Sequence, residues 1–198
     1  MSTGLDIEFV RQNYQKMTDE ELVRVATQDA AGLTPEAFEV VKEEIQSRKL
    51  DNNIIRGVEA QNRNYTIEDV DKYCEMIQKL HCPTCESSSQ NLNGAMTGEV
   101  VSFILLTQYK KKIKIGCPDC LDKANNAALI KTAALGWWGL PWGIIRSIQG
   151  IALNLKSKRT NHLGTPNNYL RTFVLSKVGQ LETYKEDQAK IQALINSA

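Results

Sequence analysis

The sequence predicts an α+β fold that is mostly helical, and three observations predict it. Toward both ends of the chain, apolar residues recur at three- or four-residue steps, the spacing of one helix face. Between them, two Cys-Pro-x-Cys pairs flank a stretch rich in β-branched and aromatic residues, which is typical of a β-hairpin. A Trp- and Gly-rich segment then predicts an elbow between two helices. With 198 residues, 42% apolar and 24% charged, the chain can bury a core in one or two domains.

Residues 1–50 are predicted to form a helical region. Thr18–Glu21 has the form of a capping box, in which the Thr hydroxyl and the Glu carboxylate each satisfy a backbone amide, so a helix begins there. Thr34-Pro35 supplies an N-cap and a first-turn proline for a second helix, and a further helix is expected around residues 7–14. The acidic residues mostly lie opposite the apolar stripe and predict a solvated face, with a docking surface as the alternative.

Residues 51–65 are polar and rich in asparagine, which predicts a linker or a frayed helical extension. Helix resumes at Thr66 and leads into the first cysteine pair. We therefore expect a metal-binding region over residues 66–125, with that helix at its start.

Four cysteines predict one bound zinc ion: Cys82, Cys85, Cys117 and Cys120. Tetrahedral Zn²⁺ takes four thiolates, and a two-residue spacer brings both sulfurs of one turn to the same metal. A thioredoxin-like redox pair is the alternative for a single pair, but two pairs flanking strand-like sequence favour a zinc ribbon. Four sulfurs leave no open position for a substrate or a water molecule, so the predicted zinc is structural.

Between the cysteine pairs, residues 100–106 read as a buried strand and residues 109–115 as a second strand that returns. Lysines near the expected turn are candidates for contact with the phosphate of a nucleic acid or of a lipid head group: Lys110, Lys111, Lys112 and Lys114. A solubilising edge that prevents strand addition is the alternative. Nucleic acid is the less favoured partner, because Tyr109 is the only adjacent aromatic residue.

Residues 126–159 are predicted to form a Trp/Gly-rich helical hairpin. From Thr132 to Leu155 the only charge is Arg146, yet Pro141 and four glycines favour two helices over one membrane span. The second helix is amphipathic. The candidate membrane or partner contacts are Trp137, Trp138, Trp142, Ile144 and Ile148. Two interpretations stay open: a wedge that enters the cytoplasmic leaflet, and tryptophans that pack the elbow onto the hairpin.

Residues 160–198 predict one long helix, or two shorter ones broken near Gly179, whose apolar stripe is typical of a core. A dimer seam is the alternative.

The net charge is −6 over residues 1–80 and +7 over residues 81–198, so the positive part faces an anionic partner or the acidic region itself. Reduced thiols on zinc and an N-terminus without a visible secretory signal predict a cytoplasmic protein, peripheral at the inner membrane.

Residues 80–160 resemble a group of poorly characterised bacterial zinc-ribbon proteins with a membrane-associated Trp/Gly segment. The resemblance is carried by CPTC, a hydrophobic hairpin ending in basic residues, CPDCLDKANN and GWWGLPWGIIRSIQ. It implies that the four cysteines bind zinc and that the tryptophans lie in the elbow. The usual knuckle often has glycine after its second cysteine, whereas Glu86 and Leu121 follow here. Residues 18–45 are similar to helical segments attached to various bacterial membrane-associated proteins.

These observations predict a non-enzymatic, zinc-stabilised adaptor that acts at the cytoplasmic membrane face through protein or lipid contacts. An enzyme is disfavoured, because the two histidines, His81 and His162, belong to no recognisable catalytic pair. The alternatives are a nucleic-acid-binding zinc ribbon and a soluble, immunity-like binder of a protein partner. The sequence predicts no particular protein partner and no oligomeric state.

Overall fold

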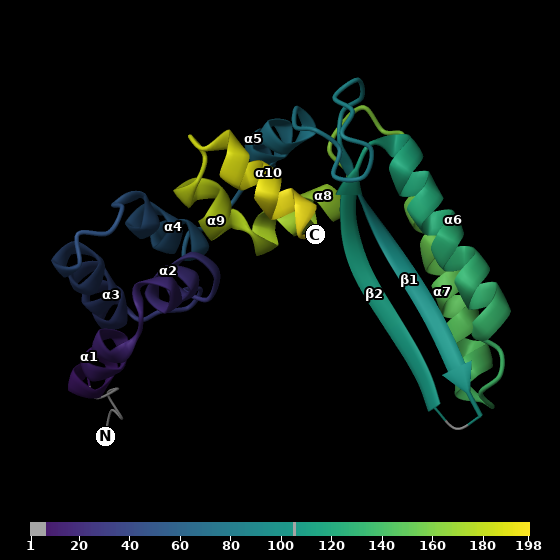
Figure 1. Ribbon diagram of the computed structural model, residues 1–198, viewed down its shortest axis with the longest axis horizontal. Helices are drawn as coiled ribbons and strands as arrows, with labels where there is room; N and C mark the ends of the chain where they lie inside the picture. The colour runs from purple at the N-terminus through teal and green to yellow at the C-terminus, as the bar shows by residue number, and fades with distance from the viewer. Residues whose placement is uncertain (1–6, 105) are drawn as a thin grey trace. The chain divides into compact units, whose positions relative to one another are not determined.

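The computed structural model describes residues 7–104 and 106–198 of the chain (Figure 1). It is mostly helical, with one two-stranded antiparallel sheet, which confirms the predicted fold class. The chain forms two compact units. The first consists of Met1–Thr66 and Ser176–Ile191, and the second of Ile67–Leu175 and Gln192–Ala198.

The first unit is a small helical domain with an apolar core. Its helices are α1 (Ile7–Lys16), α2 (Asp19–Gln28), α3 (Pro35–Ser47), α4 (Asn53–Gln61) and α9 (Val178–Thr183). The predicted capping box is present, since Thr18 Oγ1 accepts from the Glu21 amide and the Glu21 carboxylate accepts from the Thr18 amide. The Thr34 side chain caps α3 by accepting from the Ala37 amide, with Pro35 in the first turn. The core residues include Leu22, Ala26, Val40, Val41, Ile45 and Val58.

Residues 51–65, expected to be a linker or a frayed helical extension, contain helix α4, which buries Ile54 and Val58. The side chain of the asparagine that follows α4 binds backbone groups between α2 and α3. The Asn62 amide group donates to the Ala30 carbonyl at 2.9 Å and accepts from the Gly32 amide at 2.8 Å. Helix α4 also packs against α9, so the C-terminal residues 160–198 contribute to both units rather than forming one region.

The second unit is built on a long β-hairpin. Strand β1 (Asn93–Phe103) pairs with β2 (Leu106–Gly116), and the register places Asn93 opposite Gly116 and Phe103 opposite Leu106. The helices are α5 (Ile67–Gln78), α6 (Pro118–Leu135), α7 (Trp142–Lys158) and α8 (Asn168–Ser176), with α10 (Gln188–Asn196) spanning the boundary between units. The predicted regions 66–125 and 126–159 therefore belong to one unit, not two.

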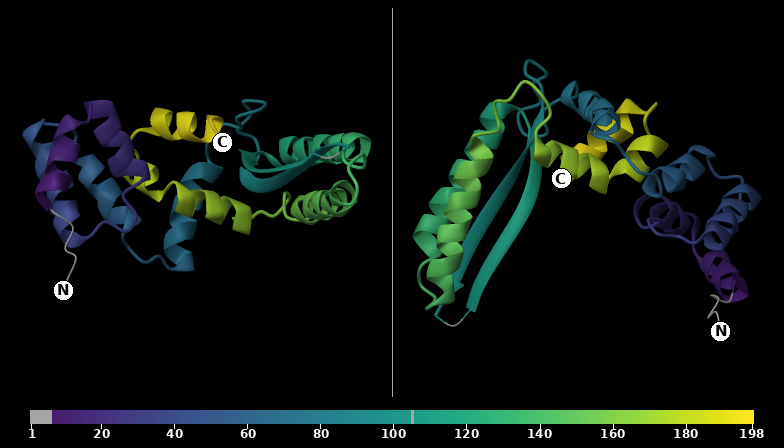
Figure 2. Two further views of the ribbon diagram at one scale, coloured as in Figure 1. Left: turned by 90° about the horizontal axis from the view of Figure 1, so that it is seen from below. Right: turned by 180° about the vertical axis from the view of Figure 1, so that it is seen from behind.

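Helices α6 and α7 lie side by side along the hairpin (Figures 1 and 2). Their elbow reaches the same end of the unit as the hairpin turn, whereas the cysteine-containing loops lie at the other end. The side chains that α6 and α7 bury are mostly small or polar: Leu121, Asn125, Ala128, Thr132, Gly143, Ser147, Gly150, Asn154 and Ser157. Large apolar side chains face outward instead, among them Ile130, Ile148 and Leu155.

The buried polar side chains close the edge of β1 that faces away from β2. Asn154 donates to the Gly98 carbonyl at 2.7 Å and accepts from the Gly98 amide at 3.2 Å. Thr132 Oγ1 accepts from the Val100 amide at 3.1 Å. Ser157 and Asn125 bind the amide and the carbonyl of the residue at position 96. Side chains thus provide the hydrogen bonds that a third strand would otherwise make.

Candidate metal centre and apolar tip

The two cysteine pairs meet at the base of the hairpin. Cys82 and Cys85 lie in the loop after α5, Cys117 is the N-cap of α6, and Cys120 lies in its first turn. The four Sγ atoms all lie within 4.8 Å of one another, and those of Cys85 and Cys117 are 3.7 Å apart. Four sulfurs at about 2.3 Å from a tetrahedral ion are separated by about 3.8 Å. The grouping of the four cysteines is therefore compatible with a single metal ion.

The residues that follow each pair explain why no glycine is needed there. Glu86 has φ 59°, in the left-handed region that favours glycine, and its amide donates to the Cys82 carbonyl at 2.8 Å. Glu86 thus adopts the conformation that glycine would supply. No left-handed residue is needed after the second pair, because that pair begins α6 and Leu121 is a buried residue of the helix.

The electrostatics at the cysteines favour thiolate at Cys82. Burial acts to raise the pKa of the Cys82 thiol, but backbone amides lower it to about 7, led by the Cys117 amide 3.3 Å from Cys82 Sγ. Burial raises the pKa values of Cys117 and Cys120. Both of these lie at the positive end of α6, which attracts the negative charge of a thiolate.

Two nearby residues of metal-binding type, a fifth cysteine and a histidine, take no part in the cluster. Cys74 is fully buried in α5, and burial raises the pKa of its thiol to about 12, as expected for a small core residue. His81 is not among the clustered residues, and its backbone exchanges hydrogen bonds with the side chain of Gln192.

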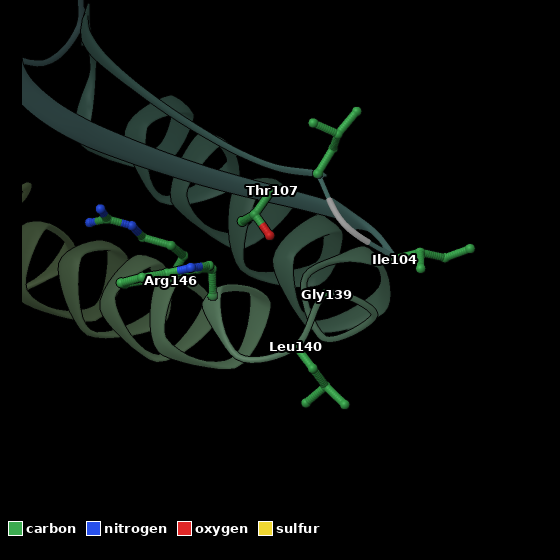
Figure 3. A pocket seen from close by; sticks show the side chains of 7 residues that line it. Ile104, Thr107, Gly139, Leu140 and Arg146 are labelled. Atoms are coloured by element: carbon green, nitrogen blue, oxygen red, sulfur yellow. The ribbon is translucent and has the colours of Figure 1, made fainter.

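At the opposite end of the hairpin, six exposed apolar side chains gather, which we call the apolar tip. The hairpin turn contributes three of them and the α6–α7 elbow the other three, with exposed fractions between 60% and 79%: Phe103, Ile104, Leu106, Trp138, Leu140 and Trp142. In the close view, Ile104 and Leu140 project outward from the end of the unit (Figure 3). Such a gathering is unusual on a protein that meets only water.

Two pockets lie between the hairpin turn and the elbow. The first has a volume of about 380 Å³ and is lined by Ile104, Leu106, Thr107, Gly139, Leu140, Trp142 and Arg146 (Figure 3). The second has a volume of about 480 Å³ and is lined by Val101, Ser102, Phe103, Ile104, Leu135 and Trp138. Only the first has a charged residue in its lining.

The structure corrects the expectation of a buried strand over residues 100–106. Val100 is buried, but Phe103, Ile104 and Leu106 are exposed because the turn falls in the middle of this run; Leu105 lies outside the described residues. No Gly, Asn or Pro marks the turn, so the sequence carried no local signal for it. The membrane or partner contacts proposed from sequence are all exposed: Trp137, Trp138, Trp142, Ile144 and Ile148. Core packing of the tryptophans is therefore not their state in this structure.

Charged residues form a collar behind the apolar tip, at one level of the hairpin. Glu99 pairs in register with Lys110 and forms an ion pair with Lys131. The Lys111 ammonium and the Arg146 guanidinium both lie within 5.9 Å of the ring centroid of Tyr109, which is paired with Val100. The members of the collar are Glu99, Lys110, Lys111, Lys131 and Arg146. Between collar and tip, the described residues of the hairpin (100–104, 106–109) and of the elbow (132–145) are uncharged.

The lysines expected near the turn begin four residues beyond Leu106, about 13 Å along the strand. They do not form one patch. Lys110, Lys112 and Lys114 alternate onto one face of β2 and Lys111 onto the other. Only Lys110 and Lys111 reach the collar.

Within residues 7–104 and 106–198, no helix has both the length and the apolar composition that crossing a membrane requires. The chain matches no protein family, curated protein or solved structure with which it was compared.

Proposed function

We propose that this protein is a non-enzymatic, zinc-stabilised adaptor that binds the cytoplasmic face of a membrane by inserting its apolar tip into one leaflet. The observation that carries the proposal is the apolar tip with a mainly cationic collar behind it. The hydrocarbon core of a bilayer is about 30 Å thick, so one leaflet offers about 15 Å. The distance along β2 from Leu106 to Lys110 is about 13 Å, which matches that depth.

The chemistry of each level fits this placement. With the tip in hydrocarbon, the four cations of the collar meet the head groups, where anionic lipids attract lysine and arginine. Trp138 and Trp142 are amphipathic rings, which favour the boundary between hydrocarbon and water. On the tip side of Glu99, the outward amide of Val100 is bonded by the Thr132 hydroxyl, so this point of β1 carries no unpaired amide toward the leaflet.

Zinc is the metal we propose for the four cysteines. A set of four thiolates suits Zn²⁺ or an iron–sulfur cluster, and the sulfur spacing matches a single tetrahedral ion. Such an ion would tie the loop after α5 to the start of α6, next to the residues where β1 begins and β2 ends. Its role is to hold the base of the hairpin, with no coordination position left for chemistry.

Flotation of the metal-loaded protein with liposomes tests membrane binding. The tip variant Phe103→Ser/Ile104→Ser/Leu106→Ser removes three exposed apolar side chains at the turn. The control variant Phe9→Ser/Ile67→Ser/Leu175→Ser removes the same residue types from exposed positions elsewhere. We expect the native protein and the control to float with anionic liposomes and the tip variant to remain in the dense fraction. The proposal would be refuted if the native protein floated with none of the liposomes at low or high salt, or if both variants lost flotation to the same extent.

A further inference from the structure

We infer that the collar contains a binding site for the phosphate group of an anionic phospholipid, formed by Lys111 and Arg146, whose charged groups both lie near the ring of Tyr109. The inference rests on the proposed membrane insertion and names the lipid class that the inserted tip selects.

Two cations share one aromatic ring at this site. Lys111 Nζ lies 5.0 Å and Arg146 Cζ lies 5.9 Å from the centroid of the Tyr109 ring. Among the described residues neither cation forms an ion pair, and the hydrogen bond of the Arg146 guanidinium goes to the neutral amide of Gln149 at 2.9 Å. Lys131, elsewhere in the collar, is by contrast neutralised by Glu99. An anion between Lys111 and Arg146 would relieve the repulsion of two like charges.

Phosphate suits this pair of cations. An arginine guanidinium offers parallel N–H donors that bind two phosphate oxygens at once, and a lysine ammonium adds a second, mobile charge. The alternation of the antiparallel ladder also turns the amides of Tyr109 and Lys111 away from β1, because the pairs on either side of them bond across the hairpin. These amides are further donors at the outer edge of β2.

The pocket beside Arg146 indicates that the phosphate belongs to a lipid. Arg146 lies at one end of this pocket, and Leu106, Leu140 and Trp142 line the remainder (Figure 3). A pocket with a cationic end and an apolar end fits a ligand with an anionic head and an acyl chain. The second pocket, lined by Leu135 and Trp138, offers no charge, so it provides no preference among head groups.

The depth of the site agrees with this occupant. Lys111 follows Leu106 by five strand residues, about 17 Å, which exceeds the depth of one leaflet, and the Arg146 guanidinium lies near the ring of Tyr109 on the same strand. When the tip lies among acyl chains, the two cations therefore lie on its water side, toward the phosphates.

A pair of charge-matched variants tests the site. Lys111→Gln/Arg146→Gln removes the two cations of the site, and Lys110→Gln/Lys131→Gln removes two other cations of the same collar. Binding is measured with phosphatidylcholine vesicles and with phosphatidylcholine vesicles that contain phosphatidylglycerol. We expect the site variant to lose about tenfold more affinity for the anionic vesicles than the control variant, since only the site variant loses the specific phosphate contacts.

Each outcome is separable from failure of the proposed function. If the native protein binds anionic vesicles and both variants lose affinity equally, the collar acts by charge alone and the phosphate site is refuted, while insertion stands. The protein can also be displaced from vesicles with competitors. If inorganic phosphate or a short oligonucleotide is as effective a competitor as dispersed phosphatidylglycerol, the occupant is not a lipid. Arg146→Lys keeps the charge but loses the paired donors. We expect its affinity for anionic vesicles to lie between those of the native protein and the site variant.

Discussion

The helix pair α2–α3 in the first unit and the helix pair α6–α7 in the second are built on opposite patterns. The first buries apolar side chains such as Leu22, Val41 and Ile45 and leaves most of its glutamates exposed. The second buries Thr132 and Asn154 and exposes isoleucines, leucines and tryptophans. The α2–α3 pattern is the one that water imposes.

The difference teaches that the two units are held by different interactions. Burial of apolar surface stabilises the first unit. In α6 and α7, small residues allow close approach and side-chain amides bind the backbone, as in helices that pack within membranes. Gly150 shows the closeness, because a Cβ there would lie 3.0 Å from a methyl group of Val100. The outward apolar residues are then free to contact lipid, in keeping with the proposed insertion.

The largest expected effect comes from removal of the metal, which should unfold part of the second unit and leave the first unit folded. Cys82→Ser should release the ion and unfold the base of the hairpin, because metal-coupled folding contributes on the order of 10 kcal/mol in small zinc sites. Hydrogen exchange of the full chain should show lost protection in β1 and α6 and retained protection in α2 and α3. An unchanged metal content in the variant would contradict the assignment of Cys82 as a ligand.

A second prediction reverses the usual rule for buried positions. Asn154→Leu places an apolar residue in a buried site, yet it should lower the free energy of unfolding by about 2–4 kcal/mol, because the Gly98 amide loses its acceptor and the Gly98 carbonyl keeps only the longer bond from Thr132. Urea unfolding measures the change. The control Asn126→Leu, at an exposed position of α6, should change it by less than about 0.5 kcal/mol. Equal effects would show that the polar face of α7 is not needed for packing.

A third prediction concerns the outer face of α7. Ile145, on the tip side of Arg146, is 43% exposed, so Ile145→Asn should leave the free energy of unfolding within about 1 kcal/mol of native. Affinity for anionic vesicles should fall about fivefold, because about 1 kcal/mol of apolar burial in lipid is lost. The same substitution at exposed Ile67 is the control and should leave vesicle affinity unchanged. A larger loss of stability in Ile145→Asn would mean that this face packs against protein.

The smallest effect concerns an ion pair that joins α5 to α8 within the second unit. Arg171 donates to Asp71 at 2.7 and 2.9 Å, and this hydrogen bonding lowers the pKa of the Asp71 carboxyl. A depressed native pKa adds stability above the unfolded value of about 3.9, and the gain disappears as pH falls through the native value. Asp71→Asn should therefore cost about 1 kcal/mol at pH 7, the partial exposure of both groups being allowed for, and nothing in strong acid. Urea unfolding as a function of pH measures this difference. A cost independent of pH would indicate that packing, not charge, joins the helices.

Local signals in the sequence were sufficient for part of this structure. The capping box, the proline at the start of α3 and the cysteine spacing each act within a few residues, so they predicted helix starts and the cysteine cluster. Periodicity identified an apolar face on α7 but not whether that face points inward. That choice depends on β1, whose edge needs the amide of Asn154 and the hydroxyl of Thr132.

The collar and the apolar tip depend on the register in which β1 pairs with β2. The sequence of one strand alone does not specify that register. Ile104 has φ 39° and forms part of a turn without glycine, so the run it belongs to resembled a continuous strand. A usable signal was nevertheless present. The described residues of 100–109 and those of 132–145 both lack charge, and two uncharged stretches of this kind lie together at one end of the unit.

The edges of the hairpin also set a limit on self-assembly. Side chains of α6 and α7 occupy the outer edge of β1, whereas among the described residues no side chain caps the outer edge of β2 in the same way. If two copies joined edge to edge, they would do so through β2 about a twofold axis, giving four strands bounded by closed edges. Such an association ends at a dimer and cannot extend into a fibre. The lysines of β2 would face one another across that seam, so repulsion opposes even this first step.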